Sequence, residues 1–250
     1  RMVTRFKGKP TKTSMAQSKQ KAIDRMVIIE APDKYDNKTF HANFQPEKET
    51  GNDVLYTSEL AIGYDHPLSV VSLDLKRGEK LGILGGNGLG KSTFLKTIVG
   101  KIPALSGEYR FGTNVQIGYF DQQMAMYTSN KTVLDDFWDE YPNLTETEAR
   151  NALGAFLFSG EDVFKNVNML SGGEKVRLAL CKILKTRPNV LVLDEPTNHM
   201  DIVGKETLES MLKDYKGTLI FVSHDRYFVK KVATQLLVFE DGTTNLYQFG

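Results

Sequence analysis

The chain has 250 residues, 40% of them apolar and 25% charged, so one large domain, or one domain with an appendage, can bury a real core. The single cysteine, Cys181, excludes an internal disulfide framework, and its apolar neighbours predict a buried thiol. No apolar run approaches the eighteen residues that would indicate a membrane-spanning helix. The net charge is +1, which by itself indicates no class of partner.

The charge is unevenly distributed, because residues 1–30 hold eight basic and two acidic side chains, a net charge of +6 that leaves −5 for the rest. Residues 15–29 have helical character, with Ile23, Met26 and Val27 on a narrow apolar face, and Pro32 ends the pattern. This basic arm indicates a polyanionic partner or, equally compatible with the charge alone, a solvated linker. The chain starts at Arg1 and resembles the middle of a longer protein.

Short alternating strands come next. Phe40, Ala42 and Phe44 are expected on one strand face, followed by strands in DVLYTSELAIGY and VVSLDL. From Lys80 the pattern changes to buried strands alternating with helices: KLGILG, then the helix KSTFLKTIV, then the apolar strands NVLVLDE and TLIFVSH. Residues from about 124 to 187 are mainly helical, and LLVFEDGTTNLYQF predicts a hairpin with Asp241-Gly242 at its turn. The expected fold class is α/β, with a mixed or parallel sheet, an antiparallel β subdomain and a helical insertion.

A phosphate-binding loop stands between the first buried strand and its helix. GGNGLGKS, from Gly85 to Ser92, fits G-x-x-x-x-G-K-[ST] in the strand–loop–helix setting that this motif requires. Its backbone N–H groups and the helix N-terminus are suited to hold phosphate oxygens, Lys91 to reach the β- and γ-phosphates, and Ser92 to bind Mg²⁺. The expected ATP-binding residues of this stretch are Gly85, Asn87, Gly88, Gly90, Lys91, Ser92 and Thr93.

Two adjacent acids, Asp194 and Glu195, follow the buried strand NVLVL. Ligands bind at the carboxyl ends of parallel strands, so Asp194 is expected to hold Mg²⁺ and Glu195 to activate water. His224 follows TLIFVS, where it can reach the γ-phosphate, and Gln122 in YFDQQ is expected to face the metal and the water. A lone histidine or glutamine is more often structural, so these two depend on the phosphate loop for their interpretation.

A second glycine turn begins a helix in the helical insertion. Ser171, Gly172 and Gly173, followed by Glu174, make another anion-binding helix start far from the strand ends. With GGNGLGKS, YFDQ, LVLDEP and SHD in this order, LSGGE resembles the ATPase domain of the ABC superfamily over about residues 50–250. The resemblance implies a head-to-tail pair of domains in which Ser171 and Gly173 bind the partner's γ-phosphate, with ATP and Mg²⁺ as cofactors. It also implies that Tyr64 stacks on adenine, although a core tyrosine is the alternative.

The stretch DEPTNHMD resembles one branch of that superfamily, the ABC-F proteins, whose motif has leucine where Met200 stands here. SHDRYF and the basic arm resemble this branch too, with Asp201 in the D-loop. The resemblance implies a cytoplasmic protein without a membrane domain that carries two ATPase domains and reaches ribosomal RNA and tRNA through its linker. Residues 1–31 would then end the interdomain linker, and residues 32–250 would be the second ATP-binding domain, with a helical subdomain at about 124–187. The chain would start inside the linker and stop before the native C-terminus.

Other readings stay open. Translation and antibiotic resistance through ribosome protection are both compatible with the ABC-F resemblance. The chain could instead be the ATPase subunit of a transporter, which would need no basic arm and would co-purify with membranes. A non-catalytic, nucleotide-dependent scaffold would release no phosphate from ATP.

Overall fold

The computed structural model describes residues 44–249. The predicted helix at 15–29, the linker at 1–31 and the strand positions Phe40 and Ala42 lie outside the described residues. Phe44 is described, is fully buried and does not lie in a strand, so the strand expected there is wrong at this position. Its ring packs edge-on against Phe156 at 5.3 Å, so contact with another aromatic ring accounts for its burial.

The smaller of the two sheets has three antiparallel strands, in the order β2-β1-β4. Its strands are β1 (Asp53–Gly63), β2 (Pro67–Lys76) and β4 (Ser106–Phe111). Buried and exposed side chains alternate along much of β2, as expected for a sheet that packs on one face and meets water on the other. Strand β4 was not predicted, because SGEYRF has few apolar residues and its place depends on pairing with β1.

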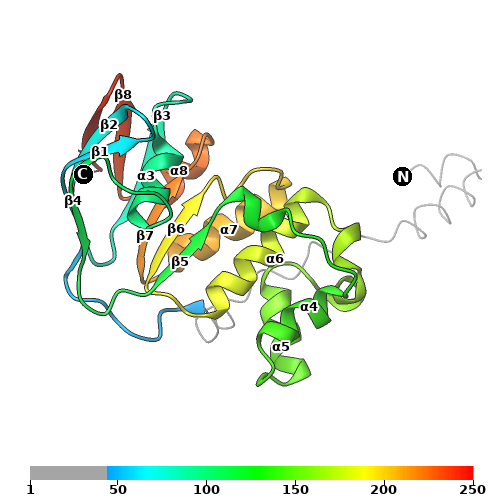
Figure 1. Cartoon of the computed structure of the whole chain (residues 1–250). Helices are drawn as coiled ribbons and strands as arrows, with labels where there is room; N and C mark the ends of the chain where they lie inside the picture. Colours follow the sequence, from blue (N-terminus) through cyan, green and yellow to red (C-terminus); the bar gives the residue numbers. More distant parts are fainter. Residues whose placement is uncertain (1–43, 250) are drawn as a thin grey trace, which may run out of the picture. The chain divides into compact units, whose positions relative to one another are not determined.

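A six-stranded sheet carries the rest of the domain, in the order β5-β6-β7-β3-β8-β9 (Figure 1). The strands are β3 (Lys80–Gly85), β5 (Ile117–Phe120), β6 (Val190–Asp194), β7 (Thr218–Val222), β8 (Gln235–Glu240) and β9 (Thr243–Gln248). All neighbours pair in parallel except β8 and β9, which form the predicted hairpin around Asp241-Gly242. Every residue of β6 and β7 is buried, so the sequence correctly predicted strands covered on both faces.

Helices flank this sheet. They are α3 (Lys91–Ile98), α4 (Val133–Glu140), α5 (Glu146–Ala155), α6 (Gly172–Lys185), α7 (Ile202–Asp214) and α8 (Arg226–Val232), with short 3₁₀ turns η2 (Gln122–Ala125), η3 (Gly160–Phe164) and η4 (Val167–Met169). Helices α4 and α5 pack on α6, and α6 packs on β5, so the predicted helical stretch groups beside that edge of the sheet (Figure 1). Cys181 on α6 is fully buried, as predicted, and burial raises the pKa of its thiol.

The main core lies between the two sheets, around α3. It contains Val54, Leu60 and Ile62 of β1, Leu81 and Ile83 of β3, and Phe94 and Leu95 of α3. The chain enters the antiparallel sheet, leaves it for β3, and returns to it at β4. The sheets also meet at their edges, where the Val70 N–H donates to Gly242 O at 3.2 Å and the Thr244 hydroxyl donates to Val70 O at 2.9 Å.

Candidate functional site

The phosphate loop spans the gap between the end of β3 and the start of α3, as predicted. Gly90 caps α3 with a φ of 102°, in the left-handed region that side chains avoid, so the loop needs glycine there. The Lys91 ammonium donates to Gly85 O at 2.8 Å and to Gly86 O at 2.6 Å. Burial lowers the pKa of Lys91, while Glu195 and Asp194 act in the opposite direction. Lys91 is thus a buried cation held inside a loop of backbone amides.

The two acids lie at the carboxyl end of β6, beside the end of β7. Asp194 accepts a hydrogen bond from Ser92, the first link between the acids and the phosphate loop. Burial is the main cause that raises the pKa of Asp194 and of Glu195. Asp194 Oδ1 is buried with no hydrogen-bond partner among residues 44–249, which marks it as a site where a ligand would bind, and Glu195 Oε1 is buried beside His224 Nε2, 3.1 Å away.

Glu195 has an unusual backbone. Its φ of 52° is in the left-handed region, a conformation that costs free energy for a residue with a side chain. Three contacts hold it: its N–H donates to Val222 O at 2.9 Å, and its carbonyl accepts from Asn198 N at 3.2 Å and from the Gln122 side-chain amide at 2.5 Å. The surrounding structure therefore fixes the direction of the Glu195 side chain.

His224 and Gln122 reach the acids from neighbouring strands. The His224 N–H donates to Glu195 Oε2 at 3.2 Å, and its Nε2 atom lies 3.1 Å from Glu195 Oε1. The imidazole is 57% exposed, so it lies beside the acid and open to solvent. Gln122 begins η2, just after β5, which pairs with β6. Adjacent strands thus bring together Lys91, Ser92, Gln122, Asp194, Glu195 and His224.

The chemistry of these residues suits the binding of magnesium and a nucleoside triphosphate. The available oxygen donors are the Ser92 hydroxyl and the Asp194 carboxylate, and the Gln122 side-chain amide donates to the backbone carbonyl of the adjacent Glu195. Mg²⁺ in nucleotide sites prefers one or two carboxylates and completes its shell with phosphate oxygens and water. Within residues 44–249 no group of three or more His, Cys, Asp or Glu could hold a metal by itself.

The other expected nucleotide contacts are accessible. Tyr64 follows β1 and is 60% exposed, so it is no core tyrosine. Asn87, Gly88 and Ser92 are exposed, while Thr93 is buried beneath the loop.

The second glycine turn has a different environment. Ser171 caps α6 in a capping box: its hydroxyl accepts from Glu174 N at 3.2 Å, and Glu174 Oε1 accepts from Ser171 N at 3.1 Å. A Cβ on Gly173 would lie 2.5 Å from His199 O, so glycine is required where the D-loop packs against the turn. Within the described residues, no hydrogen bond or ion pair joins this turn to the phosphate loop. The structure thus leaves Ser171–Glu174 apart from the residues around Lys91.

The D-loop ends at Asp201, which caps α7 by accepting from Gly204 N at 2.7 Å. Met200, the departure from the usual leucine, is buried. The side chains of Ile202 and Val203, just beyond it, are exposed, by 75% for Ile202.

Sequence reasoning missed two supporting residues. The buried Ser69 hydroxyl donates to Leu89 O at 2.7 Å and braces the phosphate loop from β2. Asp121 caps η2 and accepts from the Tyr119 hydroxyl at 2.9 Å, which positions Gln122. The N-cap pattern of an Asp before QQMA could have indicated Asp121, but no local signal indicates Ser69.

Comparisons with known proteins agree with this geometry. The chain is 48% identical over 238 residues to the ATP-binding protein YdiF of Bacillus subtilis, which covers 94% of this chain and 37% of YdiF. It is 37% identical over 240 residues to ABC transporter F family member 5 of Arabidopsis thaliana, covering 94% of this chain and 34% of that protein. The chain therefore spans well under half the length of these relatives.

Solved structures have the same fold. CbiO1 of Clostridium perfringens, part of the ABC transporter complex cbiONQ, superposes with a TM-score of 0.65 at 28% identity, over 79% of this chain and 89% of that chain. No helix within residues 44–249 is long and apolar enough to cross a membrane. One family model described as ABC transporter matches residues 68–198, and a second with that description matches residues 1–42. Because the first match covers more than half of the chain and includes the phosphate loop, both acids and the second glycine turn, this chain belongs to the ABC transporter family of ATP-binding domains.

Proposed function

We propose that this chain hydrolyses ATP as the second nucleotide-binding domain of an ABC-F protein that acts on the ribosome. The observation that supports the ATPase activity is the convergence of Lys91, the buried acids and His224 at the carboxyl end of the parallel strands. In this proposal residues 1–31 are linker, residues 32–250 are the ATP-binding domain, and about 124–187 form the helical subdomain.

The residues divide the work as follows. Tyr64 stacks on adenine, and the amides from Gly85 to Thr93 hold the phosphates together with the Lys91 ammonium. Ser92, Asp194 and Gln122 would hold Mg²⁺, which neutralises phosphate charge when bound. Glu195, whose buried Oε1 faces His224 Nε2 at 3.1 Å, accepts a proton from the attacking water. His224 contacts the γ-phosphate and orients Glu195 through the hydrogen bond from its backbone N–H.

The second glycine turn serves a partner domain. A capped helix start with exposed Ser171 and Gly172 supports a composite site in which it binds the γ-phosphate of the partner's ATP. Glu174 supports this role by holding the turn, and Asp201, at the proposed joint between domains, follows Met200, whose Cα would lie 3.1 Å from a Cβ on Gly173. The partner is the first ATP-binding domain of the same polypeptide, or a second copy of the chain.

The ribosomal role is supported by two observations. A relative at 37% identity carries the name ABC transporter F family member 5, and residues 1–30 have a net charge of +6. Lysine and arginine on phosphates would supply most of the binding to ribosomal RNA or tRNA, so binding should weaken with salt. Action in the cytoplasm, as a translation factor or in ribosome protection against antibiotics, belongs to this proposal.

The test is sedimentation of ribosomes with the full-length protein carrying Glu195→Gln, with and without ATP, at two salt concentrations. We expect ATP-dependent co-sedimentation that weakens with salt. Recovery in the membrane fraction, with no ribosome binding, would favour the ATPase subunit of a transporter, an alternative supported by the likeness to cbiO1. Absence of phosphate release from the wild-type protein would favour a non-catalytic scaffold.

A further inference from the structure

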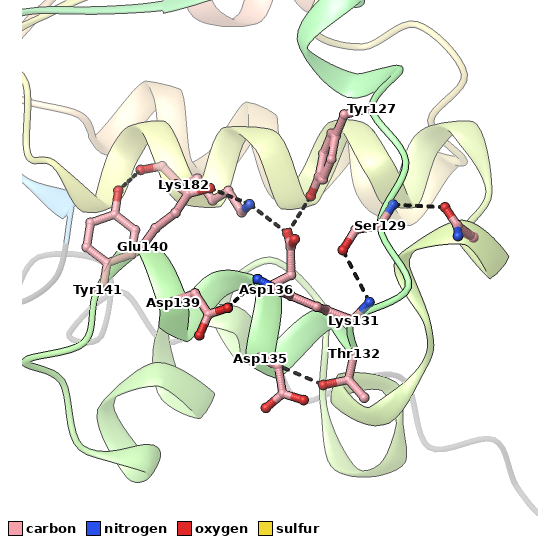
Figure 2. Close-up of polar contacts among 11 residues, drawn as sticks. Tyr127, Ser129, Lys131, Thr132, Asp135, Asp136, Asp139, Glu140, Tyr141 and Lys182 are labelled. Carbon is pink, nitrogen blue, oxygen red and sulfur yellow. Dashed lines mark hydrogen bonds and ion pairs between the residues drawn. The ribbon is translucent and has the colours of Figure 1, made fainter.

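A compact polar cluster lies outside the nucleotide site, between α4 and α6 (Figure 2). Asp136 Oδ2 accepts from the Tyr127 hydroxyl at 2.6 Å and from the Lys182 ammonium at 2.6 Å. Lys182 also donates to Glu140 Oε1 at 2.6 Å, and its backbone carbonyl accepts from the Tyr141 hydroxyl. The side chains of Asp136 and Lys182 are only 11% and 12% exposed, so the ion pair is largely shielded from water.

Further contacts hold the side chains of this cluster together. The Lys182 ammonium also lies 5.0 Å from the centre of the Tyr127 ring, within reach of a cation–π contact. Burial, and then the hydrogen bond to Asp136, raise the pKa of Tyr127, so the phenol keeps its proton and remains a donor. A carboxylate oxygen that accepts from two shielded donors favours one arrangement of their side chains. Tyr127 and Lys182 are therefore held in fixed relation through Asp136.

The elements joined by this cluster lead to the two halves of the proposed mechanism. Tyr127 follows η2, whose first residue, Gln122, contacts the Glu195 carbonyl at 2.5 Å. Lys182 lies on α6, the helix that Ser171 caps, about three turns from its start. The cluster thus connects the segment leaving Gln122 with the helix that presents Ser171.

A second set of hydrogen bonds makes the same connection nearer the glycine turn. The Ser129 N–H donates to Asn168 Oδ1 at 2.9 Å, and Asn168 Nδ2 donates to Asn130 Oδ1 at 2.8 Å. Asn166 Nδ2 donates to Asn130 O at 2.6 Å. Asn168 precedes Ser171 by three residues, so the residues from 127 to 132, which we name the bridging segment, touch both the approach to the glycine turn and its helix.

We propose that Asp136 is a positioning residue for the glycine turn, holding α6 on the bridging segment so that Ser171 meets the γ-phosphate bound by the partner domain. This inference rests on the proposed composite site. The hydrogen bonds of Asp136 go to Tyr127 and Lys182, so we expect its substitution to act mainly on the partner's nucleotide. Tyr127 and Lys182 act through Asp136 in the same way.

The experiment measures how fast labelled ATP leaves the full-length protein after a chase with unlabelled ATP, with Glu195 and the corresponding glutamate of the first ATP-binding domain both replaced by glutamine so that both sites retain ATP. Ser171→Ala is the reference: losing one hydrogen bond to a charged phosphate should release half of the label roughly tenfold faster, since one of two sites is affected. Asp136→Asn should speed release of the same half by a similar factor. Asp135→Asn is the matched control, because Asp135 is exposed on the same helix and its backbone N–H, not its side chain, donates to Thr132 Oγ1 of the bridging segment, at 3.1 Å.

The outcomes separate the two proposals. If Ser171→Ala speeds release and Asp136→Asn behaves like Asp135→Asn, Asp136 does not position the turn. If Ser171→Ala has no effect either, the composite site is wrong, and the role of Asp136 with it. A lower unfolding temperature with an unchanged release rate would show a structural role only and overturn the inference. Tyr127→Phe removes one hydroxyl and leaves the ion pair intact, so it supplies the same test, with a smaller expected increase, if Asp136→Asn does not fold.

Discussion

Replacing Glu195 with glutamine tests the assignment of the general base. Glutamine matches glutamate in shape, and its side-chain carbonyl can still accept the hydrogen bond that His224 N donates at 3.2 Å. The left-handed backbone depends on contacts of the main chain, so the substitution should not disturb it. What is lost is the ability of Oε1 to take a proton from water.

The magnitude follows from the loss of that single function. General bases contribute roughly 10²- to 10⁴-fold, or about 3 to 5 kcal/mol of the activation barrier. Turnover at this chain's site should fall by that factor, while ATP binding should persist, because a buried negative charge near the phosphates has been removed. Total phosphate release from the full-length protein should then fall at least to the rate that the other site supports.

The assay is steady-state phosphate release, with nucleotide retention on a filter as the measure of binding. Glu161→Gln is the matched control, because Glu161 is exposed on η3 and has no role in the proposed mechanism. Total phosphate release equal to that of the control, with ATP still bound, would refute the role of Glu195 as base.

Three further predictions concern the two nucleotide sites to which this chain contributes. Because burial raises the pKa of Glu195 above its ordinary value of 4.5 and the base is active when ionised, kcat should fall as pH decreases through a midpoint above 4.5; a midpoint at or below 4.5 in the pH profile would contradict this. Gly173→Ala should slow turnover at the partner domain's site at least about tenfold without loss of ATP binding, since the new Cβ meets His199 O at 2.5 Å, whereas Gly154→Ala, with open space, should match wild type in the same assay. Tyr64→Ala should weaken ATP binding in fluorescence titrations by about 1 to 3 kcal/mol while Tyr64→Phe should not, and equal affinities would exclude stacking.

The sequence predicted the parts of this domain that depend on local pattern. Continuous apolar runs indicated β6 and β7, and the phosphate loop was placed correctly between a strand and a helix. Strand β4 could not be predicted, because its exposed residues are held by pairing with β1 and not by a core of their own.

Contacts between residues far apart in the sequence limit how much of the candidate site the sequence can predict. Ser69 supports the loop through a hydrogen bond to a carbonyl twenty residues away, which leaves no periodic trace. The strained backbone of Glu195 depends on Val222 and Gln122, which come from other strands. The position of Phe44 was misjudged because its alternation with apolar neighbours mimicked a strand, while its burial comes from Phe156.

The interleaving of the two sheets has a consequence for how the domain is made. Because β3 is inserted between β2 and β4, no single cut in the chain separates one complete sheet from the other. The hairpin of β8 and β9, last among the described strands, also closes on Val70, near the start of β2. During synthesis the ribosome must release the hairpin before β8 can pair with β3 and before Gly242 and Thr244 can bond to Val70 of β2. We therefore expect the domain to fold after synthesis of β9 and to unfold in one cooperative transition.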